Sequence, residues 1–334
     1  MQTPLYIVGA GGIGCAVGYA LATARPIFVD ANLDKVRWGN QHGLMVDRRP
    51  AMPAKFMHFD DWQPESGSTV ILCTKCYDNA AVLARLPECI TLIPIQNGFD
   101  RALNPTGDDI EGIASFVSEC DVQRTSTRIT RRGALHLGCR NGGGSPAARE
   151  RLKTVASHLR GAPFKVRLVD DILPYKYAKL MYNAAISPLA AAAGLDNGQL
   201  LSVPLARRLF FALLRENYEI LTAAGIHLAR IGPLHPRHVQ RILSHPSVAN
   251  LLAVFFYPTL RGSYCSMSGD LPRGRTEIEF YNRHLIDLAK NKLCPLNRGV
   301  YDLVKRMERD RLQPDLAWLQ HVARSEPAAT AAVS

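Results

Sequence analysis

The chain has 334 residues, of which 47% are hydrophobic and 21% are charged. This balance is typical of globular proteins and excludes a disordered chain, and the length predicts two domains of about 150 residues each. The formal net charge is +11, but the longest basic runs are pairs such as Arg131-Arg132. Dispersed positive charge suits small anionic ligands, so we expect an anionic small-molecule substrate and no nucleic-acid partner.

The eight cysteines are dispersed along the chain, as is typical of reduced thiols in a cytosolic protein. Cys73 and Cys76 form a CxxC pair, but a zinc site needs a second close pair, so we expect no metal. A redox role stays open if this pair opens a helix after a strand. The longest apolar stretches, Leu180–Leu195 and Val248–Tyr257, are shorter than the ~18 residues of a membrane span. The N-terminus has no basic secretory segment, so we expect a cytoplasmic protein without a membrane partner.

The first part of the chain alternates strand and helix signals. Apolar and β-branched runs predict strands at Leu5–Val8, Pro26–Asp30, Thr69–Cys73 and Thr91–Ile95, and small residues predict a helix at Gly12–Thr23. Short apolar strands separated by helices imply a parallel sheet that is covered on both faces. The sequence therefore predicts an α/β protein with an N-terminal Rossmann-type doubly wound sheet.

Further strands are expected at Ile113–Ser118 and Ala134–Gly138, with antiparallel pairing. A glycine-rich loop at Asn141–Pro146 precedes a helix predicted at Ala147–Leu159.

The pattern becomes helical from Pro174 onward, with amphipathic stretches at Leu205–Ala224 and Glu277–Lys292. We therefore predict a Rossmann domain over residues 1–168 and an all-helical domain for substrate binding and dimerisation over 169–326. The Ala/Thr/Ser-rich tail 327–334 is expected to be frayed. The amphipathic helices suit a homodimer, although an ordinary helical core needs the same pattern.

A glycine-rich loop follows the first predicted strand and opens a helix. Its sequence, Gly9-Ala-Gly-Gly-Ile-Gly14, matches GxGxxG, in which glycines allow the tight turn, the approach of backbone to a pyrophosphate and close helix–strand packing. The predicted cofactor-binding residues of this loop are Gly9, Gly11, Gly12, Ile13 and Gly14. A tight turn without a ligand is the alternative.

Asp30 ends the second predicted strand, where an acid accepts hydrogen bonds from the ribose hydroxyls of a dinucleotide and repels the 2′-phosphate of NADP. The cofactor is therefore NAD(H) or NADP(H), with NAD favoured. Lys35 and Arg37 follow and leave 2′-phosphate binding open. A further alternative is that Asp30 only caps the next helix.

Five segments together resemble the ketopantoate reductase family over nearly the whole chain. They are Cys73–Lys75, Pro94–Gly98, Tyr177–Leu189, Ser266–Asp270 and Gly274–Glu279. The resemblance implies NAD(P)H-dependent reduction of a small 2-keto acid to the 2-hydroxy acid, of ketopantoate to pantoate or of a close analogue. It also implies an active site in the cleft between the two domains.

Lys179, Asn183 and Ser187 are spaced at i, i+4 and i+8, so they share one face of a predicted helix. Reduction of a ketone leaves an alkoxide that must be protonated, and a lysine near the carbonyl can supply the proton. By resemblance Lys179 is the general acid, while Asn183 and Ser187 bind substrate. The alternative for Lys179 is a solvated lysine whose stem covers apolar surface.

The resemblance assigns roles to other polar residues. Ser266 and Asp270 belong to the substrate site, and Lys75 and Asn97 lie beside the nicotinamide and the substrate. Glu277 contacts the substrate's distal hydroxyl and helps to place Lys179. Alternatives from local chemistry are a left-handed turn at Asn97-Gly98, and a helix start at Glu277 with a capping box formed by Thr276 and Glu279.

The sequence departs from the family pattern at four points. Tyr177 stands where tryptophan is common, Ser187 where asparagine is common and Asp30 where a basic residue often follows the second strand, and the interval from Ser266 to Glu277 is one residue shorter. A related dehydrogenase acting on an opine, a sugar acid or another hydroxy acid is therefore an alternative. A non-catalytic dinucleotide sensor is a more distant one.

Overall fold

The computed structural model describes residues 3–104, 110–159 and 161–326. The predicted frayed tail, residues 327–334, lies outside this part of the chain. The chain divides into two compact units, Met1–Leu173 and Pro174–Ser334. None of the helices in the described ranges is both long and apolar enough to cross a membrane.

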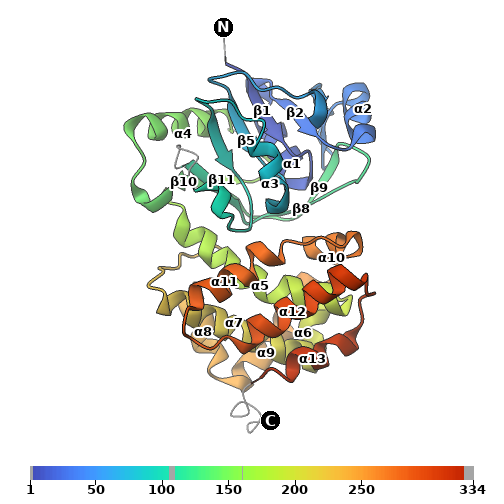
Figure 1. Ribbon diagram of the computed structural model, residues 1–334, viewed down its shortest axis with the longest axis vertical. Coiled ribbons are helices and arrows are strands. Elements are labelled where there is room, and N and C mark those ends of the chain that lie inside the picture. The colour runs from blue at the N-terminus through green and yellow to red at the C-terminus, as the bar shows by residue number, and fades with distance from the viewer. Residues whose placement is uncertain (1–2, 105–109, 160, 327–334) are drawn as a thin grey trace. The chain divides into compact units, whose positions relative to one another are not determined.

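The first unit is built on a five-stranded sheet with the order β4-β2-β1-β5-β6, in which all neighbouring strands are parallel (Figure 1). The strands are β1 (Leu5–Val8), β2 (Ile27–Asp30), β4 (Lys55–His58), β5 (Thr69–Leu72) and β6 (Thr91–Pro94). The associated helices are α1 (Gly12–Ala20), η1 (Ala22–Ala24), α2 (Leu33–His42), η2 (Phe59–Asp61), η3 (Cys76–Asp78), α3 (Asn79–Leu83) and η4 (Arg101–Leu103).

Both faces of this sheet are buried, because successive side chains of a strand point to opposite sides. Ile7 joins one hydrophobic core with Phe28, while Tyr6 and Val8 join a second core around Trp62. The continuous apolar strands and their parallel order confirm the predicted Rossmann-type sheet.

Two smaller three-stranded sheets complete the first unit, with the orders β11-β10-β7 and β3-β9-β8. Their strands are β3 (Met45–Val46), β7 (Ile110–Ala114), β8 (Val117–Cys120), β9 (Ser126–Arg131), β10 (Ala134–Cys139) and β11 (Lys165–Asp171). β10 pairs antiparallel with β7, as predicted, and also parallel with β11. η5 (Arg140–Gly142) leads to α4 (Pro146–His158), which Ser145 caps.

The prediction of one strand at Ile113–Ser118 is wrong. The chain breaks at Ser115-Phe116 and enters a different sheet. The Ser115 hydroxyl is hydrogen-bonded at the Ala134 backbone, and the buried Phe116 ring stacks on Phe164 with centroids 4.5 Å apart. These long-range contacts override the local β pattern.

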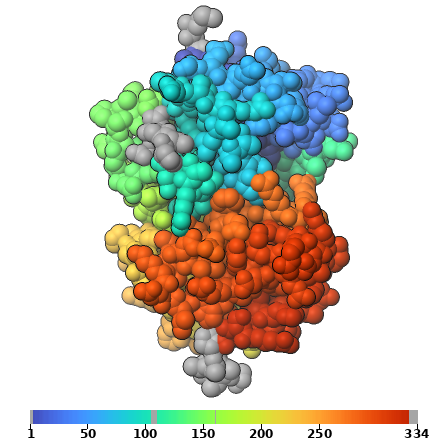
Figure 2. Space-filling view, viewed as in Figure 1, coloured from blue at the N-terminus to red at the C-terminus, as the bar shows by residue number. Residues whose placement is uncertain are grey.

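The second unit is helical throughout its described part, which confirms the predicted helical domain. Its helices are α5 (Leu173–Ala193), α6 (Gln199–Ser202), α7 (Pro204–Ala223), α8 (Pro236–Leu243), α9 (Pro246–Leu260), α10 (Ser266–Asp270), η6 (Leu271–Arg273), η7 (Ile278–Phe280), α11 (Asn282–Ala289), α12 (Pro295–Asp310), η8 (Leu316–Trp318) and α13 (Leu319–Ala323). Figure 2 shows that the C-terminal segments, in orange and red, form the face of this unit that is turned to the viewer.

The single helix predicted at Glu277–Lys292 is also wrong, because the segment is divided into η7 and α11. The break is at Tyr281, whose φ of −111° and ψ of −87° are not helical. The Tyr281 hydroxyl donates to a Glu277 carboxylate oxygen at 3.2 Å, and both side chains are buried. A buried tertiary contact therefore replaces the regular helical turn.

Candidate functional site

The glycine loop lies between β1 and α1 and packs directly on the end of β5. Gly9 has a φ of +96°, and a Cβ at this position would lie 2.8 Å from the Thr74 nitrogen. A Cβ on Gly14 would collide with the Gly9 carbonyl oxygen, whereas one on Gly11 would meet nothing within 4 Å. The loop is therefore closed on its inner side and open at Gly11, where backbone N–H groups at the start of a helix can hold a phosphate. This geometry fits the pyrophosphate of a dinucleotide.

Asp30 ties the end of β2 to the glycine loop. One carboxylate oxygen accepts from the Ala10 N–H at 2.8 Å, and the other accepts from the Asn32 N–H at 2.9 Å. The side chain that caps α2 is Asn32, which accepts from the N–H groups of Asp34 and Lys35. The alternative in which Asp30 caps this helix is therefore wrong.

Lys35 turns inward, beneath the glycine loop. Its ammonium donates to the Ala10 carbonyl at 3.2 Å, and its side chain is only 7% exposed. It is therefore not placed to bind a 2′-phosphate, and sequence proximity to Asp30 gave no sign of this orientation. Arg37, the other basic candidate, is exposed.

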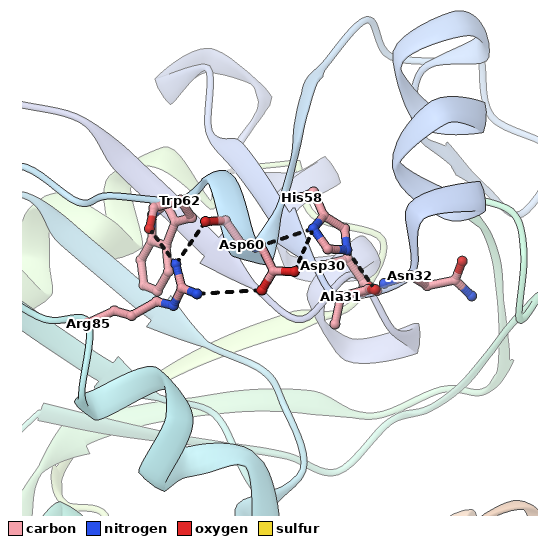
Figure 3. A network of polar contacts seen from close by, with 7 residues as sticks. All are labelled: Asp30, Ala31, Asn32, His58, Asp60, Trp62 and Arg85. Atoms are coloured by element: carbon pink, nitrogen blue, oxygen red, sulfur yellow. Dashed lines mark hydrogen bonds and ion pairs between the residues drawn. The ribbon is translucent and has the colours of Figure 1, made fainter.

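A polar chain supports the turn that follows Asp30 (Figure 3). His58 pairs with Asp30 in the register of β2 and β4, and its Nε2 donates to the Ala31 carbonyl at 3.0 Å. The Asp60 N–H donates to His58 Nδ1 at 3.3 Å, and the Asp60 carboxylate contacts Arg85 at 3.5 Å. The Arg85 guanidinium also lies over an aromatic ring, that of Phe59, at 4.4 Å. This chain fixes the backbone at the site predicted for the adenosine ribose.

The ends of β5 and β6 are joined by a buried amide pair. Gln96 donates to the Thr74 carbonyl at 2.9 Å and to the Asn79 side-chain oxygen at 2.7 Å. These bonds hold the segments that carry Lys75 and Asn97, both of which are half-buried. Sequence reasoning missed Gln96 and Asn79, because nothing in their spacing shows that they meet.

The left-handed turn proposed as an alternative at Asn97-Gly98 is wrong, because neither residue has a positive φ. The second cysteine of the CxxC pair, Cys76, does open a short 3₁₀ helix after a strand, and neither Cys73 nor Cys76 is in a disulfide. Burial, however, raises the pKa of Cys73 to about 12. A redox pair needs a lowered thiol pKa, so the structure does not support that role here. No group of three or more His, Cys, Asp or Glu in the described ranges could hold a metal ion.

In the second unit, α5 carries three of the predicted site residues. Lys179 and Asn183 are half-buried, and Ser187 is buried. The thiol of Cys265 donates to the Ser187 carbonyl at 3.3 Å. This contact brings Ser266, the exposed first residue of α10, close to the same helix. Asp270, also predicted, is buried at the other end of α10.

Three buried asparagines hold α5 at the turn that contains Asn183. Pro188 lies inside this helix, and its missing N–H leaves the carbonyl four residues earlier without its helical donor. That carbonyl, of Ala184, accepts instead from the Asn282 amide at 2.9 Å. The Asn217 amide donates to the Met181 carbonyl, also at 2.9 Å.

Asn297 closes this network from a third helix, α12. Its side-chain oxygen accepts from Asn282 at 2.9 Å, and its amide donates to the Asn217 oxygen at 2.8 Å. All three asparagine side chains are fully buried. The backbone of α5 on both sides of Asn183 is thus bonded to α7 and α11, and Asn297 links those two bonds.

The segment that carries Glu277 is fixed by Glu308 of α12. Glu308 Oε1 accepts from the Thr276 N–H at 2.6 Å and from its hydroxyl at 2.7 Å, while Lys305 contacts Oε2 at 2.6 Å. Glu279 accepts from the Tyr301 hydroxyl at 2.8 Å. The capping box given as the alternative at Thr276 and Glu279 is wrong, because the Thr276 N–H is bonded to Glu308.

Glu277 itself is buried beside Tyr281. Asn282, the residue after Tyr281, donates to α5. The Tyr177 ring of α5 also stacks on the His284 ring of α11, with ring centroids 6.0 Å apart. The structure thus connects the Glu277 segment with the helix of Lys179.

Comparison with known proteins identifies two matching family models. "Ketopantoate reductase PanE/ApbA" matches residues 5–142, and "Ketopantoate reductase PanE/ApbA C terminal" matches residues 171–308. The 2-dehydropantoate 2-reductase of Pyrobaculum aerophilum is 30% identical over 244 residues, covering 71% of this chain and 76% of that protein. That of Pyrococcus horikoshii is 26% identical over 318 residues, covering 91% of this chain and 97% of that protein.

A solved structure shows the same fold at lower identity. It is the ternary structure of D-mandelate dehydrogenase with NADH and anilino(oxo)acetate, which is 17% identical and has a TM-score of 0.72. The match covers 92% of this chain and 99% of that chain.

Proposed function

The chain belongs to the ketopantoate reductase family, and from this premise we propose that it reduces a small 2-keto acid to the 2-hydroxy acid with a reduced nicotinamide dinucleotide. The preferred substrate is ketopantoate or a close analogue. The observation that carries the proposal is the polar side of α5, where Lys179, Asn183 and Ser187 follow one another at intervals of one helical turn. Most other residues of this helix are buried, and packing alone would favour apolar residues at these three positions. Their polar side chains therefore point to ligand binding.

The chemistry requires one hydride and one proton. A bound nicotinamide dinucleotide supplies the hydride for the carbonyl carbon. Lys179 donates a proton from Nζ to the carbonyl oxygen, which would otherwise become an alkoxide. We assign Glu277 the role of placing Lys179 and the distal end of the substrate.

The remaining predicted residues bind the ligands. Asn183, Ser187 and Ser266 hold the carboxylate and hydroxyl groups of the substrate, and buried Asp270 orients Ser266 from the end of the same short helix. Lys75 and Asn97 project from the C-terminal ends of β5 and β6, where ligands of open α/β sheets bind. We place the reacting end of the cofactor beside them.

The glycine loop and Asp30 hold the rest of the dinucleotide, and NAD is favoured over NADP. The loop contributes Gly9, Gly11, Gly12, Ile13 and Gly14. Asp30 places a negative charge where a 2′-phosphate would be bound, and the nearby Lys35 is turned away beneath the loop. The D-mandelate dehydrogenase with the same fold was solved with NADH.

The same comparison favours a second candidate substrate. That enzyme was solved with anilino(oxo)acetate, an oxoacetate that carries an aromatic amino group. Tyr177 and Ser187 replace residues that are common in the family, so a 2-keto acid with an aromatic side group is the second candidate substrate.

The test is a panel of 2-keto acids assayed by the loss of nicotinamide absorbance with NADH and with NADPH. We expect steady oxidation with at least one branched or aromatic 2-keto acid and a higher kcat/KM with NADH. Dinucleotide binding without oxidation of either cofactor by any 2-keto acid would contradict the proposal and favour the sensor. Oxidation of the reduced cofactor only with an opine's imine precursor or with the keto form of a sugar acid would favour the related dehydrogenases. A homodimer stays a prediction, which light scattering of the full chain tests.

A further inference from the structure

Three side chains converge behind the dinucleotide loop on the carbonyl oxygen of Ala10. Cys15 Sγ lies 3.2 Å from this oxygen, Lys35 Nζ lies 3.2 Å from it, and Cys120 Sγ lies 3.7 Å from it. Lys35 Nζ is also 3.7 Å from Cys120 Sγ. The proposed reaction uses neither thiol, and Lys35 places an amine in contact with both Cys120 and the Ala10 carbonyl.

The two thiols have different environments. Cys15 is on α1 and is fully buried, whereas Cys120 ends β8 and is only partly buried. Both sulfurs contact the same carbonyl oxygen, and a side-chain hydrogen bond with Cys15, together with the nearby Lys35 ammonium, lowers the pKa of Cys120 below its ordinary value. The same bond and burial raise the pKa of Cys15. Cys120 is therefore the better nucleophile, and Cys15 keeps its proton.

Other cysteines of the chain differ from this pair. Burial raises the pKa of Cys73 and of Cys294, which makes both thiols inert. Cys89 is exposed, so solvent access alone would make it the most reactive. It therefore provides an internal control that separates activation from exposure.

We propose that Cys120 and Cys15 form a hydroperoxide-reactive thiol pair that controls the dinucleotide loop. The Cys120 thiolate attacks one oxygen of the hydroperoxide, the O–O bond breaks, and the other oxygen leaves as water or an alcohol after taking a proton. Cys120 is now a sulfenic acid. The Cys15 sulfur then attacks the Cys120 sulfur, the S–O bond breaks, and water leaves with the Cys15 proton. Two thiols are oxidised to one disulfide, and one hydroperoxide is reduced.

The disulfide changes the support of the loop. An S–S bond of about 2.05 Å draws the two sulfurs together and removes the Cys15 thiol proton that the Ala10 carbonyl accepts. Lys35 loses its thiolate neighbour at the same time. Ala10 lies between Gly9 and Gly11, so its peptide groups help to set the phosphate-binding turn. We expect oxidation to weaken dinucleotide binding, a consequence that rests on the proposed function.

The experiment treats the reduced full chain with hydrogen peroxide, blocks free thiols by alkylation and identifies the modified peptides by mass. We expect a Cys15–Cys120 disulfide that forms about tenfold faster than Cys89 is oxidised, because a thiolate is the reacting species. Lys35→Met should slow this reaction, and Cys15→Ser should leave a Cys120 sulfenic acid that dimedone traps. Cys89→Ser is the matched control and should change neither result.

Dinucleotide affinity is measured on the same samples before and after peroxide. We expect a dissociation constant that rises about tenfold, equivalent to about 1.4 kcal/mol, and that dithiothreitol restores. Cys120→Ser should bind the dinucleotide equally before and after treatment. The proposal would be overturned if Cys89 were oxidised as fast as Cys120 or if no disulfide formed. It would also be overturned if the dinucleotide affinity stayed unchanged after the disulfide formed. A reduced protein that forms the disulfide but never binds a dinucleotide would instead contradict the proposed function.

Discussion

Replacement of Asn282 by alanine tests how Pro188 is accommodated in α5. The Asn282 amide donates to the Ala184 carbonyl and to the Asn297 side-chain oxygen. The substitution leaves two fully buried acceptors without this donor, and each costs about 1–3 kcal/mol. We therefore expect Asn282→Ala to lower the free energy of unfolding of the second unit by about 2–6 kcal/mol.

The role of the proline follows from a double-mutant cycle. Pro188→Ala restores a backbone N–H that can donate to Ala184 within the helix, so Asn282→Ala should cost about 1–2 kcal/mol less in that background. Asn217→Ala is the matched control. Its acceptor, the Met181 carbonyl, faces the N–H of residue 185, which Pro188→Ala does not change. The Asn217 and Pro188 substitutions should therefore be additive within about 0.5 kcal/mol.

The assay is urea unfolding followed by pulse alkylation of Cys294. This thiol is 1% exposed and lies three residues before Asn297, so its labelling reports unfolding of the second unit. A coupling energy between Asn282 and Pro188 close to zero would refute the reasoning, because the Ala184 carbonyl would then not depend on Asn282. An equal coupling for Asn217 would refute it as well.

Three further predictions concern the glycine loop and the two cores. Asp30→Asn removes the charge but keeps a side-chain oxygen, so it should raise the affinity for NADPH relative to NADH by about tenfold, as measured by dinucleotide titration. An unchanged ratio of the two affinities would show that the carboxylate does not discriminate between NADH and NADPH. Glu308→Leu leaves the buried Thr276 N–H and hydroxyl without their acceptor and should destabilise the second unit by about 2–4 kcal/mol. Glu308→Gln keeps an acceptor and should cost less than half as much. Equal losses of stability for the two variants in urea unfolding would contradict this prediction. Burial, with the nearby Arg167, lowers the pKa of His136 to about 4 from 6.5, so the unfolded chain binds more protons than the folded chain between these pH values. The free energy of unfolding of the first unit should therefore fall by about 1–3 kcal/mol as the pH decreases from 6.5 to 4. His136→Gln should remove this pH dependence, and an unchanged pH dependence would assign it to other groups.

Local signals in the sequence predicted the parts of the site that are local in the fold. β1 and the glycine loop occupy one short segment, and Asp30 follows one strand later, so their apolar runs and glycines predicted these elements, while the roles of the residues stay predictions. Lys179, Asn183 and Ser187 lie on a single helix, and their spacing alone places them on one face. Such features depend on few distant contacts.

The features that the sequence did not predict depend on partners far along the chain. Asn282 and Ala184 are 98 residues apart, and Glu308 and Thr276 are 32 apart. Capping rules consider only near neighbours, so they assigned Thr276 to a local box that Glu308 replaces. One signal was available, because a proline inside a helix predicts that some side chain must donate to the carbonyl four residues before it.

Lys35 shows a related difficulty. A lysine that follows an acidic strand end suggests phosphate binding, but its long stem can equally turn inward to a buried carbonyl. The choice depends on the thiols of Cys15 and Cys120 and on the Ala10 backbone, which come from three different elements. Sequence position alone does not distinguish these two orientations.

The most direct measurement compares Lys179→Ala with wild type in turnover and in dinucleotide affinity. We expect kcat with the best 2-keto acid to fall by roughly 10²–10⁴, the usual effect of losing a general acid, while the dissociation constant of the dinucleotide stays within about twofold. Lys292→Ala, which removes an exposed lysine of the same unit that pairs with Glu219, should change neither quantity. Undiminished turnover by Lys179→Ala would show that another group protonates the carbonyl oxygen, and the proposed mechanism would be wrong.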